Sequence, residues 1–143
     1  MSNLKKIISW YENLNKITLN QIEIFYDKDV FFKDPFNEFR GRDRVRKIFD
    51  HMFDNFGDPH FVFIDTIENE EEAFLTWDFF LRFNGKDYKI HGSSHLKYNK
   101  EYIICYHRDY WDVGEEVLLN VPFVKYMYGF FRKKLAITED IKC

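Results

Sequence analysis

Between residues 60 and 111, apolar and polar residues alternate in four consecutive runs. Alternation with a period of two predicts β-strands that bury one face, and short turns between strands predict an antiparallel meander. The turn Asn84-Gly85-Lys86 contains Asn-Gly, the pair most common in tight hairpins. The four predicted strands are His60–Glu68, Ala73–Phe83, Asp87–Asn99 and Glu101–Trp111. The expected buried face of the second strand carries Ala73, Leu75, Trp77, Phe79, Leu81 and Phe83.

Before these strands, the apolar positions follow helical spacing. Ser2 or Asn3 is expected to cap a first helix, with a stripe of Leu4, Ile7, Ile8, Tyr11 and Leu14. Thr18 and Gln21 have the spacing of a capping box, which predicts a second helix that carries Leu19, Ile22, Phe25 and Tyr26. The following segment, Asp29–Phe36, is predicted to be extended, because Pro35 disfavours helix at the residue before it.

A third helix is predicted from Asp43, as its cap, to Gly57, as its C-terminal cap. Its apolar face is Val45, Ile48, Phe49, Met52, Phe53 and Phe56. His51 falls away from that face and is expected on the surface. After the strands, Pro122 suits the start of a last helix, with Phe123, Val124, Met127, Tyr128 and Phe131. Helices followed by a meander predict a single α+β domain over residues 1–143.

Aromatic residues are unusually frequent: 17 Phe, nine Tyr and three Trp. Such rings either wall a cavity for a flat ligand or fill a solid core, and the sequence leaves both open. The formal net charge is −3, and nucleic-acid binders usually have a basic surface, so nucleic acid is not an expected partner. The cationic Arg132-Lys133-Lys134 is expected to complement a helix dipole.

Two cysteines make no disulfide framework, and no apolar run resembles a signal peptide or a membrane span. A cytoplasmic protein without membrane attachment is therefore expected. His91 and His95 share a strand face but lie roughly 13 Å apart, too far for one metal ion. No glycine-rich phosphate loop and no convincing nucleophile triad are present, so no metal or cofactor is expected.

The candidate chemistry lies in His107-Arg108-Asp109-Tyr110-Trp111-Asp112, which ends the fourth strand. Alternation puts Ile103, Cys105, His107, Asp109 and Trp111 on one face, and Ile104, Tyr106, Arg108, Tyr110 and Asp112 on the other. An imidazole and a carboxylate two positions apart can both reach one small ligand. The alternative is that Asp109 pairs with an arginine such as Arg40 or Arg42, and that His107 is a hydrogen-bonded core histidine.

The order of these elements, with "DVFFKDPF" before the third helix and "HRDYWD" on the last strand, resembles the SnoaL-like group of the nuclear transport factor 2-like superfamily. The resemblance covers roughly Ile7 to Pro122. It implies an α+β cone, in which N-terminal helices cover the concave face of a curved antiparallel meander around a pocket. It also implies a homodimer through the outer sheet face, where strand parity puts His91 and His95. The superfamily includes enzymes, binding modules and dimerisation subunits, so the fold alone does not assign a function.

The segment Asp29–Pro35 is similar to the stretch that holds the general base of ketosteroid isomerases, and the matching residue is Asp34. The isomerase's oxyanion-hole positions fall on Trp10, with Tyr11 adjacent, and on Ser94, which do not reproduce its tyrosine and protonated aspartate. The "HRDYWD" segment is similar to the aspartate-bearing strand end of limonene-epoxide hydrolases and SnoaL-type polyketide cyclases, which implies Asp109 as the proton-exchanging acid. The hydrolase's arginine and second carboxylate have no match at the inward Gly92, Ser94 and Leu96.

The first hypothesis is therefore cofactor-free acid/base chemistry on a small apolar or aromatic molecule, with Asp34 and Asp109 as acid/base groups and His107 in support. Its expected ligand-binding residues are Trp10, Tyr11, Phe32, Phe36, Trp77, Phe79, Ser94 and Trp111. The second hypothesis is a non-catalytic binding or dimerisation module. The third is a macromolecular adaptor, which would need a large exposed apolar patch.

Overall fold

The structure is a computed structural model that describes residues 2–116 and Lys133. Residues 1–111 form one compact unit and residues 112–143 a second one, of which the short helix α4 (Val113–Glu116) is described. The predicted last helix, with Phe123, Val124, Met127, Tyr128 and Phe131, lies outside the described residues. No helix in the described part of the chain has the length and apolar character that a membrane span requires.

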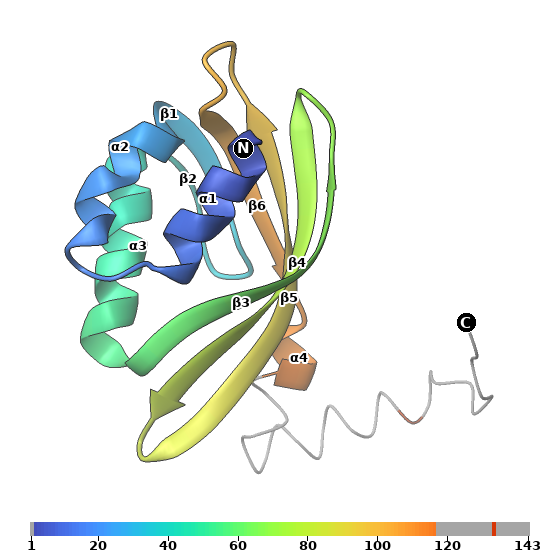
Figure 1. Cartoon of the computed structure of the whole chain (residues 1–143). Helices are drawn as coiled ribbons and strands as arrows, with labels where there is room; N and C mark the ends of the chain where they lie inside the picture. The colour runs from blue at the N-terminus through green and yellow to red at the C-terminus, as the bar shows by residue number, and fades with distance from the viewer. Residues whose placement is uncertain (1, 117–132, 134–143) are drawn as a thin grey trace. The chain divides into compact units, whose positions relative to one another are not determined.

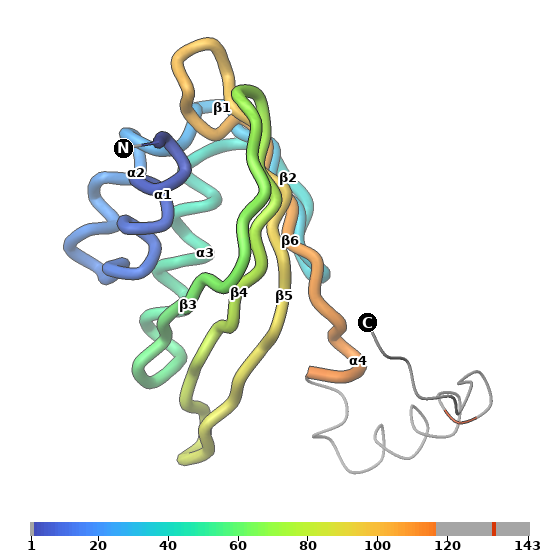
Figure 2. The backbone as a smooth tube through the Cα atoms, turned by 45° about the vertical axis from the view of Figure 1, so that its right-hand side comes forward, coloured from blue at the N-terminus to red at the C-terminus, as the bar shows by residue number. Residues whose placement is uncertain are grey.

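The first unit is an α+β structure with a curved, unclosed sheet of six strands (Figures 1 and 2). The strands lie in the order β2-β1-β6-β5-β4-β3. Their bounds are β1 Tyr26–Lys33, β2 Glu38–Arg40, β3 Gly57–Glu68, β4 Glu72–Phe83, β5 Lys86–Tyr98 and β6 Ile104–Trp111. The predicted antiparallel meander is confirmed in β3 to β6. Two pairings were not predicted: β1 lies antiparallel to β2, and it lies parallel to β6, with Phe32 opposite His107.

The helices cover one face of this sheet, which we call the inner face; the opposite face is the outer face (Figure 1). The helical segments are α1 Asn3–Glu12, the 3₁₀ helix η1 Thr18–Gln21, α2 Ile22–Phe25 and α3 Arg42–Asn55. Ser2 caps α1 as predicted, since its side chain accepts from the Lys5 amide. His51 is exposed, as expected.

The prediction of a continuous second helix through Tyr26 is wrong. The Asn15 side chain accepts from the Ile17 and Thr18 amides, and the Thr18 hydroxyl donates to the carbonyls of Asn13 and Asn15, so the capping box with Gln21 does not form. One turn of 3₁₀ and one of α-helix follow, and β1 already begins at Tyr26. Tyr26 therefore lies on a sheet strand next to β6.

The predicted caps of the third helix are also wrong. Gly41, with φ of +120°, takes the N-cap position, and Asp43 lies in the first turn of α3 without capping it. Gly57 begins β3, because the chain turns directly from Phe56 into an extended conformation. The Asn84-Gly85 hairpin is as predicted: both residues have positive φ, the conformation that a tight two-residue turn requires.

The strand faces follow the predicted alternation with two exceptions. Ala73, Leu75, Trp77, Phe79 and Leu81 are buried, whereas Phe83, the last residue of β4, is 46% exposed and contacts the ring of Phe56 at the end of α3. On β6 a bulge beside Lys97 and Tyr98 shifts the register, so Ile104 is fully buried although alternation had placed it outward. His107, Asp109 and Trp111, beyond the bulge, keep the predicted parity.

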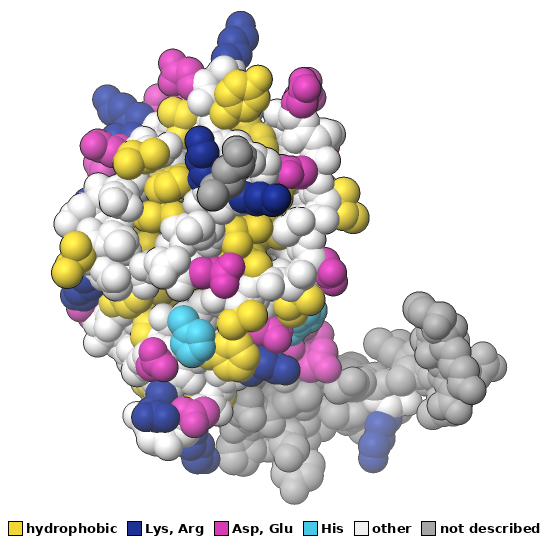
Figure 3. All heavy atoms as spheres, in the orientation of Figure 1, with side chains coloured by type: hydrophobic (Ala, Val, Ile, Leu, Met, Phe, Trp, Pro, Cys, Tyr) yellow, Lys and Arg dark blue, Asp and Glu magenta, His cyan; other side chains and the backbone are white. Residues whose placement is uncertain are grey.

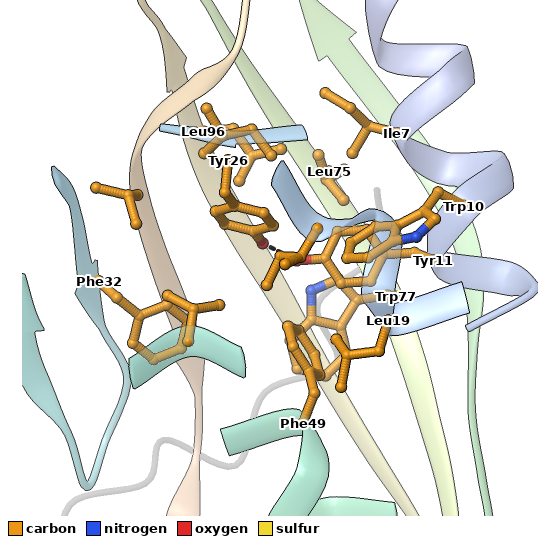
Figure 4. Packing of buried hydrophobic residues seen from close by; sticks show 14 of the residues in the cluster. Ile7, Trp10, Tyr11, Leu19, Tyr26, Phe32, Phe49, Leu75, Trp77 and Leu96 are labelled. Atoms are coloured by element: carbon orange, nitrogen blue, oxygen red, sulfur yellow. Dashed lines mark hydrogen bonds between the residues drawn. The ribbon is translucent and has the colours of Figure 1, made fainter. Parts of the chain in front are cut away.

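The interior is aromatic (Figure 4), and a glycine makes room for its largest ring. Gly92 pairs with Trp77 across β4 and β5, and a Cβ atom at Gly92 would lie 2.5 Å from Cη2 of the Trp77 indole. The indole thus lies directly on the backbone of β5. From there its Nε1 reaches the next inward residue, Ser94.

Gly92→Ala is therefore expected to lower the free energy of unfolding by about 1–3 kcal/mol, because the added methyl group overpacks the indole. Chemical denaturation of the two proteins measures the difference. Ser93→Ala, one position away on the outer face, is the matched control and should change the free energy by less than about 0.5 kcal/mol. Equal effects of the two substitutions would contradict the close contact.

Candidate functional site

Six buried or half-buried side chains form one continuous hydrogen-bond chain on the inner face, which we call the Asp109 network. It runs from Tyr11 through Tyr26, His107, Asp109 and Ser94 to Trp77. Tyr26 Oη lies 2.7 Å from His107 Nδ1, and His107 Nε2 lies 2.6 Å from Asp109 Oδ1. Ser94 Oγ donates to the same Oδ1 at 2.5 Å, and Trp77 Nε1 donates to Ser94 Oγ at 2.9 Å. Figure 4 shows the hydroxyl groups of Tyr11 and Tyr26 meeting between α1 and β1.

Strand register explains how residues so far apart in the sequence meet. Ser94 pairs with Asp109 across β5 and β6, and both point inward. The parallel pairing of β1 with β6 brings Tyr26 to His107, 81 residues away along the chain. Only Tyr11 comes from the helix layer, so the network connects α1 to four strands of the sheet.

The network has one assignment in which each of its O–H and N–H groups has an acceptor. Indole Nε1–H can only donate, so Ser94 accepts from Trp77 and donates its own proton to Asp109. From the other side, Tyr11 donates to Tyr26, Tyr26 donates to Nδ1 of His107, and Nε2–H of His107 donates to Asp109. If the donors and acceptors from Tyr11 to His107 were reversed, the Tyr11 hydroxyl would have no acceptor. Both arms therefore end on one oxygen, Oδ1 of Asp109.

The second oxygen of Asp109 is left for other partners. No described residue donates a hydrogen bond to Oδ2, although an ionised carboxylate can accept about four. The side chains of His107 and Asp109 are 5% and 20% exposed. Asp109 is thus anchored through one oxygen, with the other available at a partly accessible position.

The alternative of an arginine partner for Asp109 is wrong. The Arg40 guanidinium lies over the ring of Phe31, and Arg42 donates to the Tyr26 carbonyl. Among the described residues, the one ion-pairing partner of Asp109 is His107. The other half of that alternative is right, because His107 is a buried, hydrogen-bonded histidine.

Burial also affects the tyrosines of the network. It raises the pKa of Tyr11, although the hydrogen bond with Tyr26 opposes that effect, and it raises the pKa of Tyr26 well above its ordinary value. Both hydroxyl groups therefore stay protonated at physiological pH. They act as hydrogen-bond donors, and the directions assigned above need both protons.

Asp34 has a different environment. Its Oδ1 accepts from the backbone amides of Phe36 and Asn37 at 2.8 and 2.7 Å, and Asn37 Nδ2 lies 3.1 Å from both of its oxygens. These bonds close the turn between β1 and β2, as an aspartate before a proline commonly does. Asp34 is not part of the Asp109 network.

The remaining predicted site residues fall into two groups. Trp10, Phe32 and Phe79 are buried: Trp10 stacks on Phe25 and donates to the Thr18 carbonyl, Phe32 packs on His107 and Phe79 stacks on Phe61. Phe36 lies in the turn between β1 and β2, and Trp111 is the last residue of β6; their rings contact edge to face at 5.5 Å. Phe36 is 68% exposed.

Sequence reasoning missed Tyr26, which looked like part of a helical stripe. The signal was the alternation of Val30 and Phe32, which reaches Tyr26 with the same period of two. The exposed Lys28 interrupts this pattern, in the stretch where the β1 register shifts between Tyr26 and Phe31. Ser94, by contrast, was expected inward and is buried there, at 5% exposure.

The outer face has its own histidine pairs. His91 and His95 lie there as predicted, at 2.8 Å from Asp78 Oδ1 and at 2.7 Å from Glu72 Oε2. Among the described residues, no three histidine, cysteine or acidic side chains come together as metal ligands. On the face shown in Figure 3, acidic and basic side chains are interspersed and no basic patch stands out.

Comparison with known proteins assigns the family. The profile of the SnoaL-like domain matches residues 7–106, more than half of the chain. The chain belongs to the SnoaL-like family. No curated protein matches the sequence.

Solved structures agree on the fold. An NTF2-like protein of unknown function from Burkholderia pseudomallei superposes with a TM-score of 0.71 at 17% identity, over 85% of this chain and 99% of that one. An M. tuberculosis LEH-like epoxide hydrolase gives 0.67 at 13% identity, over 93% and 95%. A Catenulispora acidiphila protein with a ketosteroid isomerase-like fold, in complex with trimethylamine, gives 0.68 at 12%, over 81% and 91%. At these identities the likeness establishes the NTF2-like fold.

Tyr26→Phe is expected to destabilise the protein by about 1–3 kcal/mol, because it leaves Nδ1 of His107 and the Tyr11 hydroxyl unpaired in the interior. The control is Tyr98→Phe, since Tyr98 Oη is buried without a hydrogen-bond partner among the described residues. Its removal should be neutral or stabilising. Denaturant titration of both variants measures the contrast, and a cost for Tyr98→Phe equal to that for Tyr26→Phe would argue against the network.

Proposed function

We propose that this SnoaL-like protein binds a small, largely apolar molecule on the inner face beside Asp109, and that Asp109 exchanges a proton with it through Oδ2. The observation that carries this proposal is the arrangement of the carboxylate. Oδ1 accepts from His107 and Ser94 at 2.6 and 2.5 Å, while no described residue binds Oδ2. A base held in this way needs no rearrangement to meet a substrate proton.

The chemistry of such a site is simple. Oδ2 takes a proton from a substrate carbon or from a water molecule and returns it to another position of the substrate. His107 and Ser94 keep the carboxyl group in place through both steps, and the hydroxyl groups of Tyr26 and Tyr11 hold the imidazole. This is isomerase, cyclase or hydrolase chemistry without a cofactor, and the structural likeness to an LEH-like epoxide hydrolase supports it.

Asp34 has a secondary role in this proposal. Asp34 directly follows Lys33, the last residue of β1, which pairs with Arg108 of β6. Its oxygens hold the turn, so it contributes negative charge and shape at the edge of the site, and the acid/base step belongs to Asp109.

Binding without turnover is the second candidate function. One observation favours it: the donors at the isomerase's oxyanion-hole positions are already occupied. Trp10 Nε1 donates to the Thr18 carbonyl at 2.9 Å, and Ser94 donates to Asp109. A developing oxyanion would have to displace one of these bonds or take a donor from elsewhere.

A thermal-shift screen with steroids, terpenoids and aromatic polyketides tests the proposal, because a ligand that binds only the folded protein raises its melting temperature. Each hit is then incubated with the protein and the products are analysed. Asp109→Asn is expected to retain the fold by circular dichroism and to lower turnover at least 100-fold, a typical contribution of a general base, about 10²–10⁴-fold. Asp34→Asn should retain most turnover. Hits that bind but never react would favour the second candidate, and full activity of Asp109→Asn would contradict the acid/base role.

We also propose a homodimer through the outer face. Apolar side chains on this face are exposed by 43–50%, namely Val62, Ile64, Phe74 and Tyr110. Arg40, Lys97 and Arg108 lie over rings of β1 and β6, while the carboxylates Glu72 and Asp78 lie on β4. A second copy related by a two-fold axis would pair this face with itself and cover the apolar side chains.

Sedimentation velocity at several concentrations tests this interface. The protein is expected to sediment with twice the chain mass. Phe74→Lys should raise the dissociation constant of the dimer at least tenfold, because the lysine charge enters an apolar contact. Ile17→Lys is the control, since Ile17 is 80% exposed but precedes η1 in the helix layer. A wild-type protein that is monomeric throughout the range would rule the dimer out.

A further inference from the structure

The hairpin between β4 and β5 has an Asn-Gly sequence at its tip, remote from the Asp109 network. Asn84 and Gly85 connect Phe83 and Lys86, the paired residues at the ends of the two strands. Both residues of the tip are exposed, and both have positive φ, +51° and +74°. Of the asparagines in the sequence, Asn84 is the one that a glycine follows. This dipeptide suits the turn, and it also has a reactivity of its own.

The side chain of Asn84 differs from those of the other described asparagines in its hydrogen bonds. Each of the others donates or accepts at least one hydrogen bond through its side-chain amide. They are Asn3, Asn13, Asn15, Asn20, Asn37, Asn55, Asn69 and Asn99. Within residues 2–116 the Asn84 side chain forms none, and the Gly85 N–H forms none either. The amide carbon of Asn84 is therefore free to rotate towards the Gly85 nitrogen.

Gly85 presents no steric obstacle to this approach. A Cβ atom built at Gly85 would meet no atom within 4 Å, so the tip of the hairpin is open on that side. Glycine itself has no Cβ that would shield its nitrogen, and its backbone reaches more of φ/ψ space than that of any other residue. The attack requires the ψ angle of Asn84 to rotate away from its value in the turn. Loop tips open locally at little cost in free energy, so β4 and β5 need not unfold for this rotation.

We propose that Asn84 is a site of spontaneous deamidation. The Gly85 backbone nitrogen attacks Cγ of Asn84, and the new N–Cγ bond closes a succinimide ring. The Cγ–Nδ2 bond breaks, and the amide nitrogen leaves as ammonia with the proton of the Gly85 N–H. Water then opens the ring. Its addition at Cγ breaks the N–Cγ bond and gives aspartate, whereas its addition at the backbone carbonyl carbon breaks the peptide bond and gives isoaspartate, whose chain runs through the side chain.

The two products differ in their effect on the hairpin. Asp-Gly suits a tight two-residue turn as Asn-Gly does, so the aspartyl form retains the register of β4 and β5. The isoaspartyl form adds a methylene group to the backbone of a two-residue loop. Loop length fixes the register of a hairpin, so the added group disturbs the pairing of Phe83 with Lys86.

Incubation of the full chain at physiological pH and temperature, followed by proteolysis and mass spectrometry, tests the site. The peptide that contains Asn84 is expected to lose ammonia and gain water, and isoaspartyl methyltransferase should label its isoaspartyl fraction. Asn69 and Asn99 are the controls in the same digest, since they also lie between strands but have bonded side chains and precede larger residues. Asn84 should react at least about tenfold faster than either, because a Cβ atom on the next residue hinders the attacking nitrogen. Equal rates at the three positions would overturn the proposal.

A second comparison separates the folded hairpin from its sequence. The same chain in denaturant gives the rate of deamidation of an unrestrained Asn-Gly pair. The folded protein is expected to react within about tenfold of that rate, because no hydrogen bond holds either group at the tip. A folded protein that reacts more slowly than this would overturn the proposal, since the turn would then protect Asn84.

The two products are compared by their melting temperatures. Asn84→Asp provides the aspartyl form, and the isoaspartyl form is separated from aged protein by chromatography. The two have the same charge and differ only in the path of the backbone. Asn84→Asp is expected to melt with the unaged protein and the isoaspartyl form at a lower temperature. Equal melting temperatures of the two products would contradict the disturbed pairing of Phe83 with Lys86.

Discussion

The structure depends on one carboxylate oxygen that two hydrogen-bonded arms approach from opposite sides. An ionised carboxylate can only accept and an indole N–H can only donate, so Asp109 at one end and Trp77 at the other set the direction of the Ser94 hydroxyl between them. The same requirement orders the tyrosine arm through His107. A polar chain inside an aromatic core is stable only when every member has its partner. Each residue of the network is therefore held by its neighbours as much as by its own strand.

The parallel contact between β1 and β6 makes this arrangement possible. It joins β1, the first strand in the sequence, to β6, the last described strand in the sequence. It is the one parallel pairing among the described strands. Tyr26 and Phe32 reach His107 through it, and the contact between Phe36 and Trp111 continues it beyond the strand ends. The candidate site is thus located where the N-terminal and C-terminal parts of the first unit meet.

The two faces of the sheet use similar residues in different environments. On the outer face, Asp78 and His91 form a pair whose histidine side chain is 55% exposed, so water reaches it. On the inner face, His107 is 5% exposed and is packed by Tyr26 and Phe32. Exclusion of water strengthens hydrogen bonds and charge interactions on the inner face. The same His–Asp contact is therefore solvent-exposed on one face and part of a candidate site on the other.

The sequence alone determined much of this fold, because local periodicity is written into neighbouring residues. The four meander strands, the Asn84-Gly85 hairpin, the inward positions of Trp77, Ser94, His107 and Asp109, and the family itself followed from pattern and motif. Tertiary structure decided what depends on contacts between distant segments. The parallel place of β1, the bulge that turns Ile104 inward, and the choice of His107 over an arginine as the partner of Asp109 each arise from pairing across the sheet. No spacing along the chain encodes such pairings, because they are settled by which backbones lie side by side after the whole unit has packed.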